Sequence, residues 1–139
     1  MAQKEIKTSI QITATPEKVW KVLTNFQEYK NWNPFLKSVE GHVKKGETIK
    51  INADGMKFKP KVLSFEENKQ FSWIGKLLFK GLFDGEHLFL IEDNGDGTVT
   101  FRQEEKFQGI LVGLFAKKLD TDTRQGFMQM NKKLKELSE

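Results

Sequence analysis

LVGLFAKKLDTDTRQGFMQMNKKLKEL, residues 111–137, is the stretch that determines the architecture of this chain. Apolar side chains recur along it every three or four residues, which is the spacing of one face of an α-helix. A helix over these residues would be roughly 40 Å long at about 1.5 Å per residue. The face comprises Phe115, Leu119, Thr123, Phe127, Met130, Leu134 and Leu137. A long helix with one apolar face needs a partner surface of similar length, such as a sheet.

The rest of the chain supplies strands for that sheet. Residues 6–13 alternate between apolar and polar side chains, which predicts a half-buried strand. The tetrapeptide Asn94-Gly95-Asp96-Gly97 predicts the turn of a hairpin near the end of the chain. The further predicted strands cover residues 38–43, 48–53, 57–65, 70–77, 86–92 and 98–107.

Two short helices are predicted between the first strand and the others. Thr15 suits the N-cap of the first helix, and Pro16 suits its first position. The second covers residues 28–32 and ends before Pro34, because proline disfavours helical geometry in the preceding residue. The predicted order is β-α-α-β6-α. This is an α+β arrangement in which a curved antiparallel sheet of about seven strands wraps around the long C-terminal helix, in a single domain of residues 1–139.

Composition excludes several classes of site. The 139 residues include no cysteine, so disulfides and thiolate metal sites are excluded. The two histidines, His42 and His87, lack metal-ligand spacing, and no glycine-rich phosphate loop or G-x-S-x-G motif is present. We therefore expect neither a metal nor a cofactor.

Charge and hydropathy limit the partners. The net charge is +4, but the lysines are spread along the chain and alternate with acidic residues, so no nucleic-acid partner is expected. Transient contact with an anionic membrane stays open. No apolar run reaches the roughly 20 residues needed to cross a bilayer, and the first residues have no apolar signal core. A cytoplasmic location is expected, and the oligomeric state is not predicted.

Three local patterns accompany this order of elements. They are Thr15-Pro16-Glu17-Lys18-Val19-Trp20, Trp32-Asn33-Pro34-Phe35, and residues 81–90 followed by residues 101–109. With these patterns the chain resembles the START-like, or SRPBCC, helix-grip superfamily, and within it the polyketide cyclase/dehydrase branch. The resemblance implies a cavity between the sheet and the long helix, entered near the short helices and the loops opposite. It leaves the function open, because the superfamily includes lipid carriers, plant hormone sensors, aromatases and cyclases.

The last hairpin carries a group of polar candidates. Alternation places His87 and Phe89 on one face of its first strand, and Gln103 and Glu105 on one face of its second. The turn brings His87 beside Gln103 or Glu105. These side chains either satisfy one another, orient a ligand's carbonyl or hydroxyl group, or transfer a proton with His87 as acid or base.

Aromatic residues provide the remaining candidates. Trp32 and Phe35 either plug the core or form the mouth of the cavity, and Trp73 is part of its wall or of the core. Residues 76–83 form a short apolar segment that gates the cavity, touches a membrane or folds inward. The full set of predicted ligand contacts is Trp32, Phe35, Trp73, His87, Phe89, Phe101, Gln103, Glu105, Phe115, Phe127 and Met130.

Three functions fit this reading. The first, which we prefer, is binding of one small hydrophobic molecule, such as a lipid, an isoprenoid or an aromatic, polyketide-like compound. The second is a polyketide cyclase or aromatase in which His87 and Glu105 transfer protons while the cavity folds the substrate. The third is a cochaperone-like protein-binding module, which would require an open apolar groove.

Overall fold

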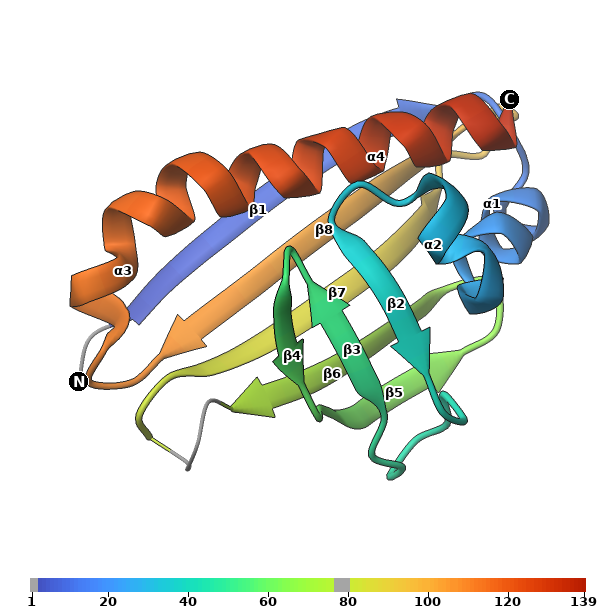
Figure 1. Cartoon of the computed structure of the whole chain (residues 1–139). Helices are drawn as coiled ribbons and strands as arrows, with labels where there is room; N and C mark the ends of the chain where they lie inside the picture. The colour runs from blue at the N-terminus through green and yellow to red at the C-terminus, as the bar shows by residue number, and fades with distance from the viewer. Residues whose placement is uncertain (1–2, 77–80) are drawn as a thin grey trace.

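A computed structural model describes residues 3–76 and 81–139 and has an α+β architecture (Figure 1). Strand β1 (Gln3–Ile12) is followed by helix α1 (Pro16–Leu23), the 3-10 turn η1 (Phe26–Glu28) and helix α2 (Tyr29–Trp32). The next strands are β2 (Leu36–Glu40), β3 (Lys50–Ala53), β4 (Met56–Phe58), β5 (Lys61–Glu66), β6 (Gln70–Lys76), β7 (Asp84–Asp93) and β8 (Val99–Gln108). The chain ends in helix α3 (Val112–Lys118), the π-helical turn η2 (Leu119–Thr123) and helix α4 (Arg124–Ser138).

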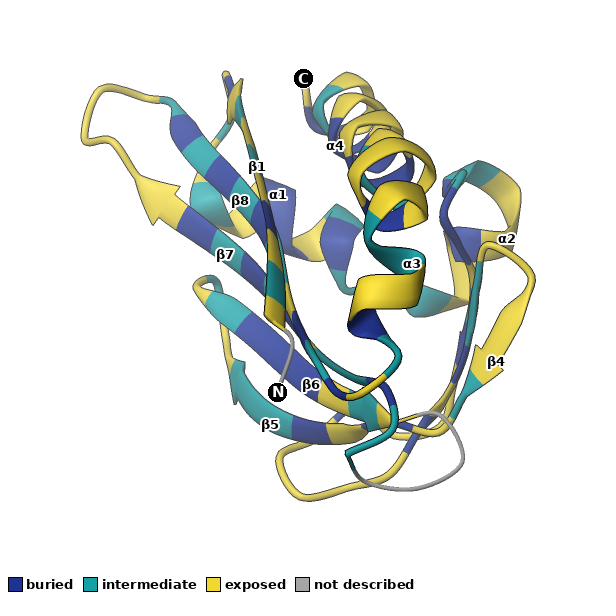
Figure 2. Ribbon diagram, turned by 90° about the vertical axis from the view of Figure 1, so that its left-hand side faces the viewer, coloured by how far each residue is buried: buried dark blue, intermediate teal, exposed yellow. Residues whose placement is uncertain are grey.

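The described strands form two antiparallel sheets. One has the order β1-β8-β7-β6-β5, and the other has the order β2-β3-β4. Helix α4 runs along β1 and β8 in Figure 1. Figure 2 shows the buried residues of the sheets and of α4 facing the space between them. The predicted wrapping of an antiparallel sheet around the C-terminal helix is confirmed.

The predicted single strand over residues 57–65 is wrong, and so is the estimate of about seven strands in one sheet. Residues 3–76 and 81–139 form eight strands, and β4 and β5 belong to different sheets. Pro60 lies between them and has no N–H to donate to a ladder, which favours a break there. An isolated bridge joins Thr48, just before β3, to Lys61, the first residue of β5.

Helix α1 begins with the capping residues that the sequence predicted. Thr15 accepts a hydrogen bond from the backbone N–H of Lys18 at 3.2 Å, and Pro16 occupies the first helical position. After α2, the side-chain oxygen of Asn33 accepts from the backbone N–H groups of Phe35 at 2.9 Å and Leu36 at 2.8 Å. These two bonds fix the turn that directs Phe35 toward the C-terminal helix.

The C-terminal helical segment differs from the prediction in two respects. Its middle is a π-helical turn, η2, which interrupts the regular α-helix. Leu137 was expected on the buried face and is 48% exposed instead. The buried line passes from Leu134 to Ser138, four residues later, so Leu137 lies off the face that meets the sheet.

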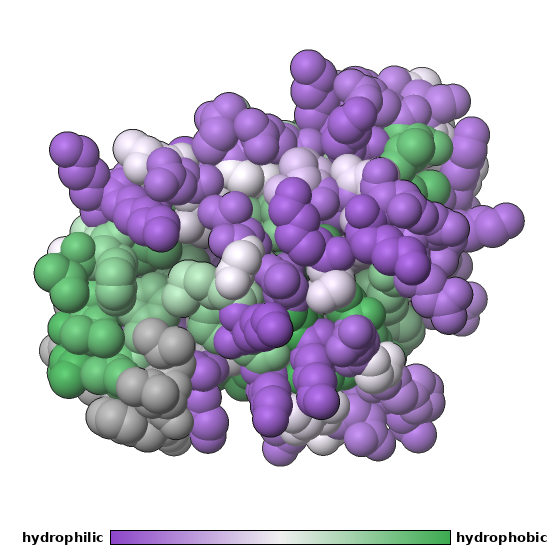
Figure 3. Space-filling model, in the orientation of Figure 1, coloured by the Kyte–Doolittle hydropathy of each residue, from purple (hydrophilic) through white to green (hydrophobic). Residues whose placement is uncertain are grey.

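The surface is mostly polar in the view of Figure 3, with apolar side chains gathered at the end where α3 begins. Ile110 and Leu114 at this end are 68% and 76% exposed. Of the predicted apolar segment 76–83, residues 77–80 lie outside the described residues. No helix among the described residues is long and apolar enough to span a membrane. Transient membrane contact stays a prediction.

Candidate functional site

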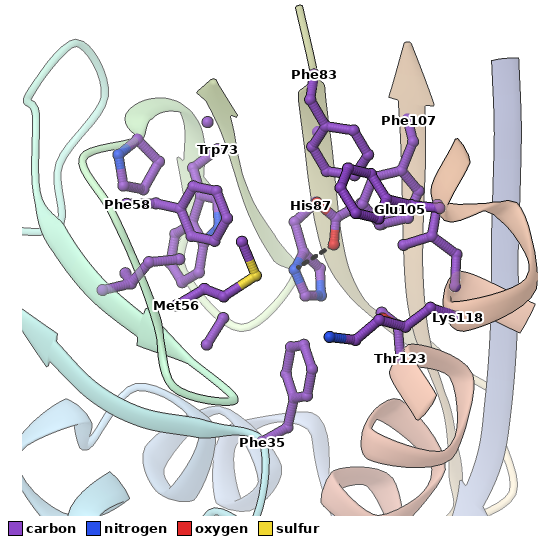
Figure 4. Close-up of a pocket in the computed structure, with 17 residues that line it drawn as sticks. Phe35, Met56, Phe58, Trp73, Phe83, His87, Glu105, Phe107, Lys118 and Thr123 are labelled. Atoms are coloured by element: carbon purple, nitrogen blue, oxygen red, sulfur yellow. Dashed lines mark ion pairs between the residues drawn. The ribbon is translucent and has the colours of Figure 1, made fainter. Parts of the chain in front are cut away.

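A pocket of about 120 Å³ lies between the two sheets and the segment formed by α3 and η2 (Figure 4). Most of its wall is apolar, and aromatic rings form a large part of it. The rings are those of Phe35, Phe58, Trp73, Phe83, Phe107 and Phe115. Among the described residues, the polar side chains of the lining are those of His87, Glu105, Lys118 and Thr123. An apolar enclosure with a few convergent polar groups is the usual form of a small-molecule site.

The imidazole and the carboxyl group in this wall come from neighbouring strands. His87 of β7 and Glu105 of β8 are direct partners in the antiparallel register, as the hairpin predicted. His87 Nδ1 lies 3.2 Å from Oε1 of Glu105, the contact drawn as a dashed line in Figure 4. His87 Nε2 lies 3.0 Å from Oε1 of Gln103. His87 is 3% exposed and the Glu105 side chain is 14% exposed.

The His87 ring is held between two phenyl rings. Its centroid lies 4.1 Å from that of Phe89 and 4.7 Å from that of Phe127, and both pairs are stacked. Neither phenylalanine lines the pocket, but together they fix the ring and exclude water from its faces. This burial lowers the pKa of His87 from 6.5 to about 3, against an opposing effect of the hydrogen bond with Gln103.

A chain of hydrogen bonds sets the direction of every donor behind His87. The hydroxyl of Thr8 donates to the backbone carbonyl of Gln103 at 2.8 Å, and a carbonyl can only accept. The Thr8 oxygen therefore accepts from Nδ2 of Asn131 at 2.9 Å. The Asn131 oxygen in turn accepts from Nε2 of Gln103 at 2.8 Å, which leaves the Gln103 oxygen facing His87. His87 must therefore carry its proton on Nε2 when it is neutral.

This tautomer determines the state of Glu105. The neutral imidazole presents a lone pair on Nδ1, so Oε1 of Glu105 must bear a proton to bond to it. Burial raises the pKa of Glu105 from 4.5 to about 8, which favours the neutral acid. At neutral pH the pair therefore shares one proton, and Oε2 of Glu105 is left as an acceptor.

Two glycines on neighbouring strands face each other in the pocket wall, and one of them, Gly85, makes room for Glu105. Gly75 of β6 and Gly85 of β7 are register partners, and both line the pocket. A Cβ atom on Gly85 would lie 2.3 Å from Oε2 of Glu105. The carboxyl group thus occupies the place that a side chain at position 85 would take. Within the described residues, Oε2 makes no hydrogen bond to another group.

The structure places part of the predicted contact set in the pocket wall. Phe35, Trp73, His87, Glu105 and Phe115 line it. The other predicted ligand contacts lie outside the pocket wall, which corrects the position expected for them. Trp32 packs against Tyr29, with ring centroids 5.2 Å apart. The remainder are fully buried, because they pack between the sheet and α4 behind the pocket: Phe89, Phe101, Gln103, Phe127 and Met130.

Sequence reasoning missed several residues of the wall. Met56 and Phe58 come from the three-stranded sheet, whose position over the helix no local pattern indicates. Gly75 was detectable as a glycine inside a predicted strand, which often marks a close approach, whereas Gly85 directly precedes the predicted strand 86–92. Thr123 was noticeable as the polar member of an apolar helix face. No cluster of three potential metal-ligating side chains occurs in residues 3–76 and 81–139.

Comparison with known proteins agrees with this architecture. The sequence profile of a family described as "Polyketide cyclase / dehydrase and lipid transport" matches residues 3–139. Among curated protein sequences none matches the chain.

Solved structures resemble the chain at low sequence identity. The hypothetical protein jhp0584 from Helicobacter pylori superposes with a TM-score of 0.85 at 16% identity, over 98% of this chain and 88% of that one. A Thalictrum norcoclaurine synthase mutant in complex with a transition-state analogue gives 0.74 at 10% identity, over 99% and 94%. The di-domain ARO/CYC protein StfQ of the steffimycin pathway gives 0.77 at 9% identity, over 98% and 51%. At such identities the likeness shows a common fold alone.

Proposed function

Because the chain belongs to the polyketide cyclase/dehydrase and lipid transport family, we propose that it binds one small, mainly apolar molecule in the pocket of Figure 4. The observation that carries the proposal is an aromatic pocket wall interrupted by a buried acid–imidazole pair. Burial of the ligand's apolar surface provides the affinity, and the pair recognises one polar group.

The size of the pocket supports a ligand, or a ligand part, with the dimensions of one ring. Its volume is about 120 Å³. An apolar cavity of roughly 150 Å³ is known to take up benzene, whereas pockets for larger ligands have roughly 300–1,000 Å³. A longer molecule would extend past Met56, which is 44% exposed, or would move side chains at the rim.

The polar end of the ligand follows from the direction of the proton. Glu105 directs its proton at His87, so its Oε2 accepts a hydrogen bond from the occupant. A hydroxyl group, as in a phenol, an enol or an alcohol, meets this requirement. A ketone or ether oxygen at the same place would face Oε2 of Glu105, so that two acceptors would oppose each other, which is unfavourable in a site without water.

A second function, cyclase- or aromatase-type catalysis, is supported by the same pair. Burial separates the two pKa values in opposite directions, with His87 at about 3 and Glu105 at about 8. Paired titratable groups with separated pKa values are typical of acid–base sites. In this alternative the Glu105 carboxyl group gives its proton to a substrate oxygen, and the resulting carboxylate takes a proton from a substrate carbon, while neutral His87 holds the carboxyl group in place through Nδ1.

Native mass spectrometry of the freshly purified protein tests ligand binding. We expect an extra mass that disappears on denaturation, and the formula of the released compound then identifies the ligand class. Gly75→Leu should abolish ligand binding, because a side chain at this position points at Phe58 and Pro60 and fills the pocket. Ile74→Leu is the control, since the neighbouring residue is on the exposed face of the same strand. Wild-type protein that retains no mass and binds no added aromatic alcohol would contradict the proposal.

A further inference from the structure

Lys118 is the one cationic side chain among the described residues that line the pocket. The lining includes two ionisable side chains besides His87, namely Glu105 and Lys118. Glu105 is the neutral partner of His87, as the hydrogen-bond directions require. Among the described residues of the wall, the unbalanced positive charge is therefore located at Lys118.

The π-helical turn places this charge. Lys118 is the last residue of α3, and the π turn η2 starts at Leu119. Lys118, Leu119 and Thr123 all line the pocket, although in a regular α-helix residues 118 and 123 would be about 140° apart around the axis. The wider turn therefore brings a cation and a hydroxyl to the same opening. In Figure 4 the Lys118 side chain extends from the helix into the pocket, with its nitrogen toward the space between His87 and Phe35.

No carboxylate among the described residues neutralises Lys118 within 4 Å. The nearest acid along the helix, Asp120, pairs instead with Lys4 at 2.6 Å and with Arg124 at 3.6 Å. A cation that faces an apolar opening without a counter-charge favours an anionic occupant.

We propose that the natural ligand is an apolar acid, with a ring or short chain in the aromatic pocket and a carboxylate or similar anion bound by Lys118. This inference rests on the proposed function, and it adds the charge of the ligand. The lysine contributes one ion pair at the rim, so it determines the preference for acids over neutral analogues and leaves most of the affinity to apolar burial.

Two probes with the same apolar body test the inference. Cinnamate and cinnamamide differ at one group and have a size suited to the pocket. Isothermal titration near neutral pH and low salt should show cinnamate binding about three- to tenfold more tightly than cinnamamide. Lys118→Gln should abolish that difference, and Lys118→Arg should retain most of it. Lys117→Gln is the matched control, because Lys117 is exposed on the same helix and does not line the pocket.

The outcomes separate this inference from the proposed function. Equal affinity of the wild type for both probes would overturn the inference and leave the pocket as a site for neutral ligands. A cinnamate preference that persists in Lys118→Gln, with an unchanged melting temperature, would overturn it as well. Binding of neither probe, together with no retained mass in the native spectrum, would contradict the proposed function itself.

Discussion

Nδ1 of His87 and Oε1 of Glu105 lie 3.2 Å apart on adjacent strands, and the hydrogen-bond chain behind His87 requires one shared proton between them. The chain is anchored at the backbone carbonyl of Gln103, which can only accept. Burying a neutral pair of this kind costs little free energy of desolvation. A charged pair in the same place would lose more hydration and would need other contacts to compensate for it.

The shared proton predicts a stability maximum in mildly acidic solution. Burial raises the pKa of Glu105 from 4.5 to about 8, so folded protein keeps a proton that the unfolded chain loses, and stability falls as pH rises between these values. Burial lowers the pKa of His87 from 6.5 to about 3, so stability also falls as pH drops between those values. The two slopes oppose each other between pH 4.5 and 6.5.

Urea unfolding across this pH range measures the effect. From pH 6.5 to 8 the free energy of unfolding should decrease by at most about 1.4 kcal/mol per pH unit. Glu105→Gln should remove this decrease, because the amide donates to Nδ1 of His87 and does not ionise. A wild-type stability that rises between pH 6.5 and 8 would show that Glu105 is ionised in the folded state.

The close approach of Gly126 to Phe35 predicts that Gly126→Ala destabilises the wild-type protein but stabilises a variant that lacks the Phe35 ring. A Cβ atom on Gly126 would lie 2.4 Å from Cδ1 of Phe35, so Gly126→Ala should destabilise the protein by about 1–3 kcal/mol. In a Phe35→Ala background Cγ and Cδ1 of residue 35 are both absent, and the same change should stabilise the protein by about 0.5–1 kcal/mol through helix propensity. Thermal or urea unfolding of the four proteins gives the cycle. Destabilisation of equal size in both backgrounds would mean that the ring and the helix are not in this contact.

The hydrogen-bond chain predicts that the hydroxyl group of Thr8 contributes to the stability of the fold. Thr8→Val preserves shape but leaves Nδ2 of Asn131 without its acceptor, which should cost about 1–3 kcal/mol. Thr100→Val is the control, since the hydroxyl of Thr100 bonds to the exposed turn residue Asn94 and should contribute less. If both variants unfold at the same urea concentration, the chain through Asn131 contributes nothing to the fold.

Gly85 predicts a coupling with Glu105. Gly85→Ala places a Cβ against Oε2 of Glu105 and should cost about 1–3 kcal/mol by displacing the carboxyl group from His87. In a Glu105→Ala background the clash is gone, so the additional cost of Gly85→Ala should be small. Additive free energies of unfolding would contradict the close approach. The position of the His87 side-chain resonances offers a second readout of the displacement.

Local patterns predicted most of the fold but only part of the pocket wall. Strand alternation and the Asn94–Gly97 turn placed His87 beside Gln103 or Glu105, because a hairpin's register follows from its turn and its apolar face, and the structure brings both side chains to His87. Thr15 and Pro16 likewise determined where α1 begins.

The remainder depends on contacts that no local period encodes. The break at Pro60 separates β4 from β5, and it places Met56 and Phe58 across the pocket from β6 and β7. The π turn rotates α4 relative to α3, which brings Lys118 into the wall. A helical period assumed to be constant across that turn cannot show such a rotation. Phe89 and Phe127 were assigned to the ligand, whereas in the structure their rings stack against the His87 ring, because a pattern that shows a side chain to be buried does not show which group it contacts.

The most direct test of ligand binding beside the His87–Glu105 pair is a nuclear magnetic resonance titration with cinnamyl alcohol, which combines a ring with a hydroxyl donor. The account predicts saturable shifts of the Gly75 and Gly85 amides and of the His87 imidazole nitrogens, with no shift at Gly95 in the exposed hairpin turn. The same titration of Gly75→Leu should show no saturable change at these positions. Saturable shifts confined to residues outside the pocket wall, or none at the highest soluble concentration, would contradict it.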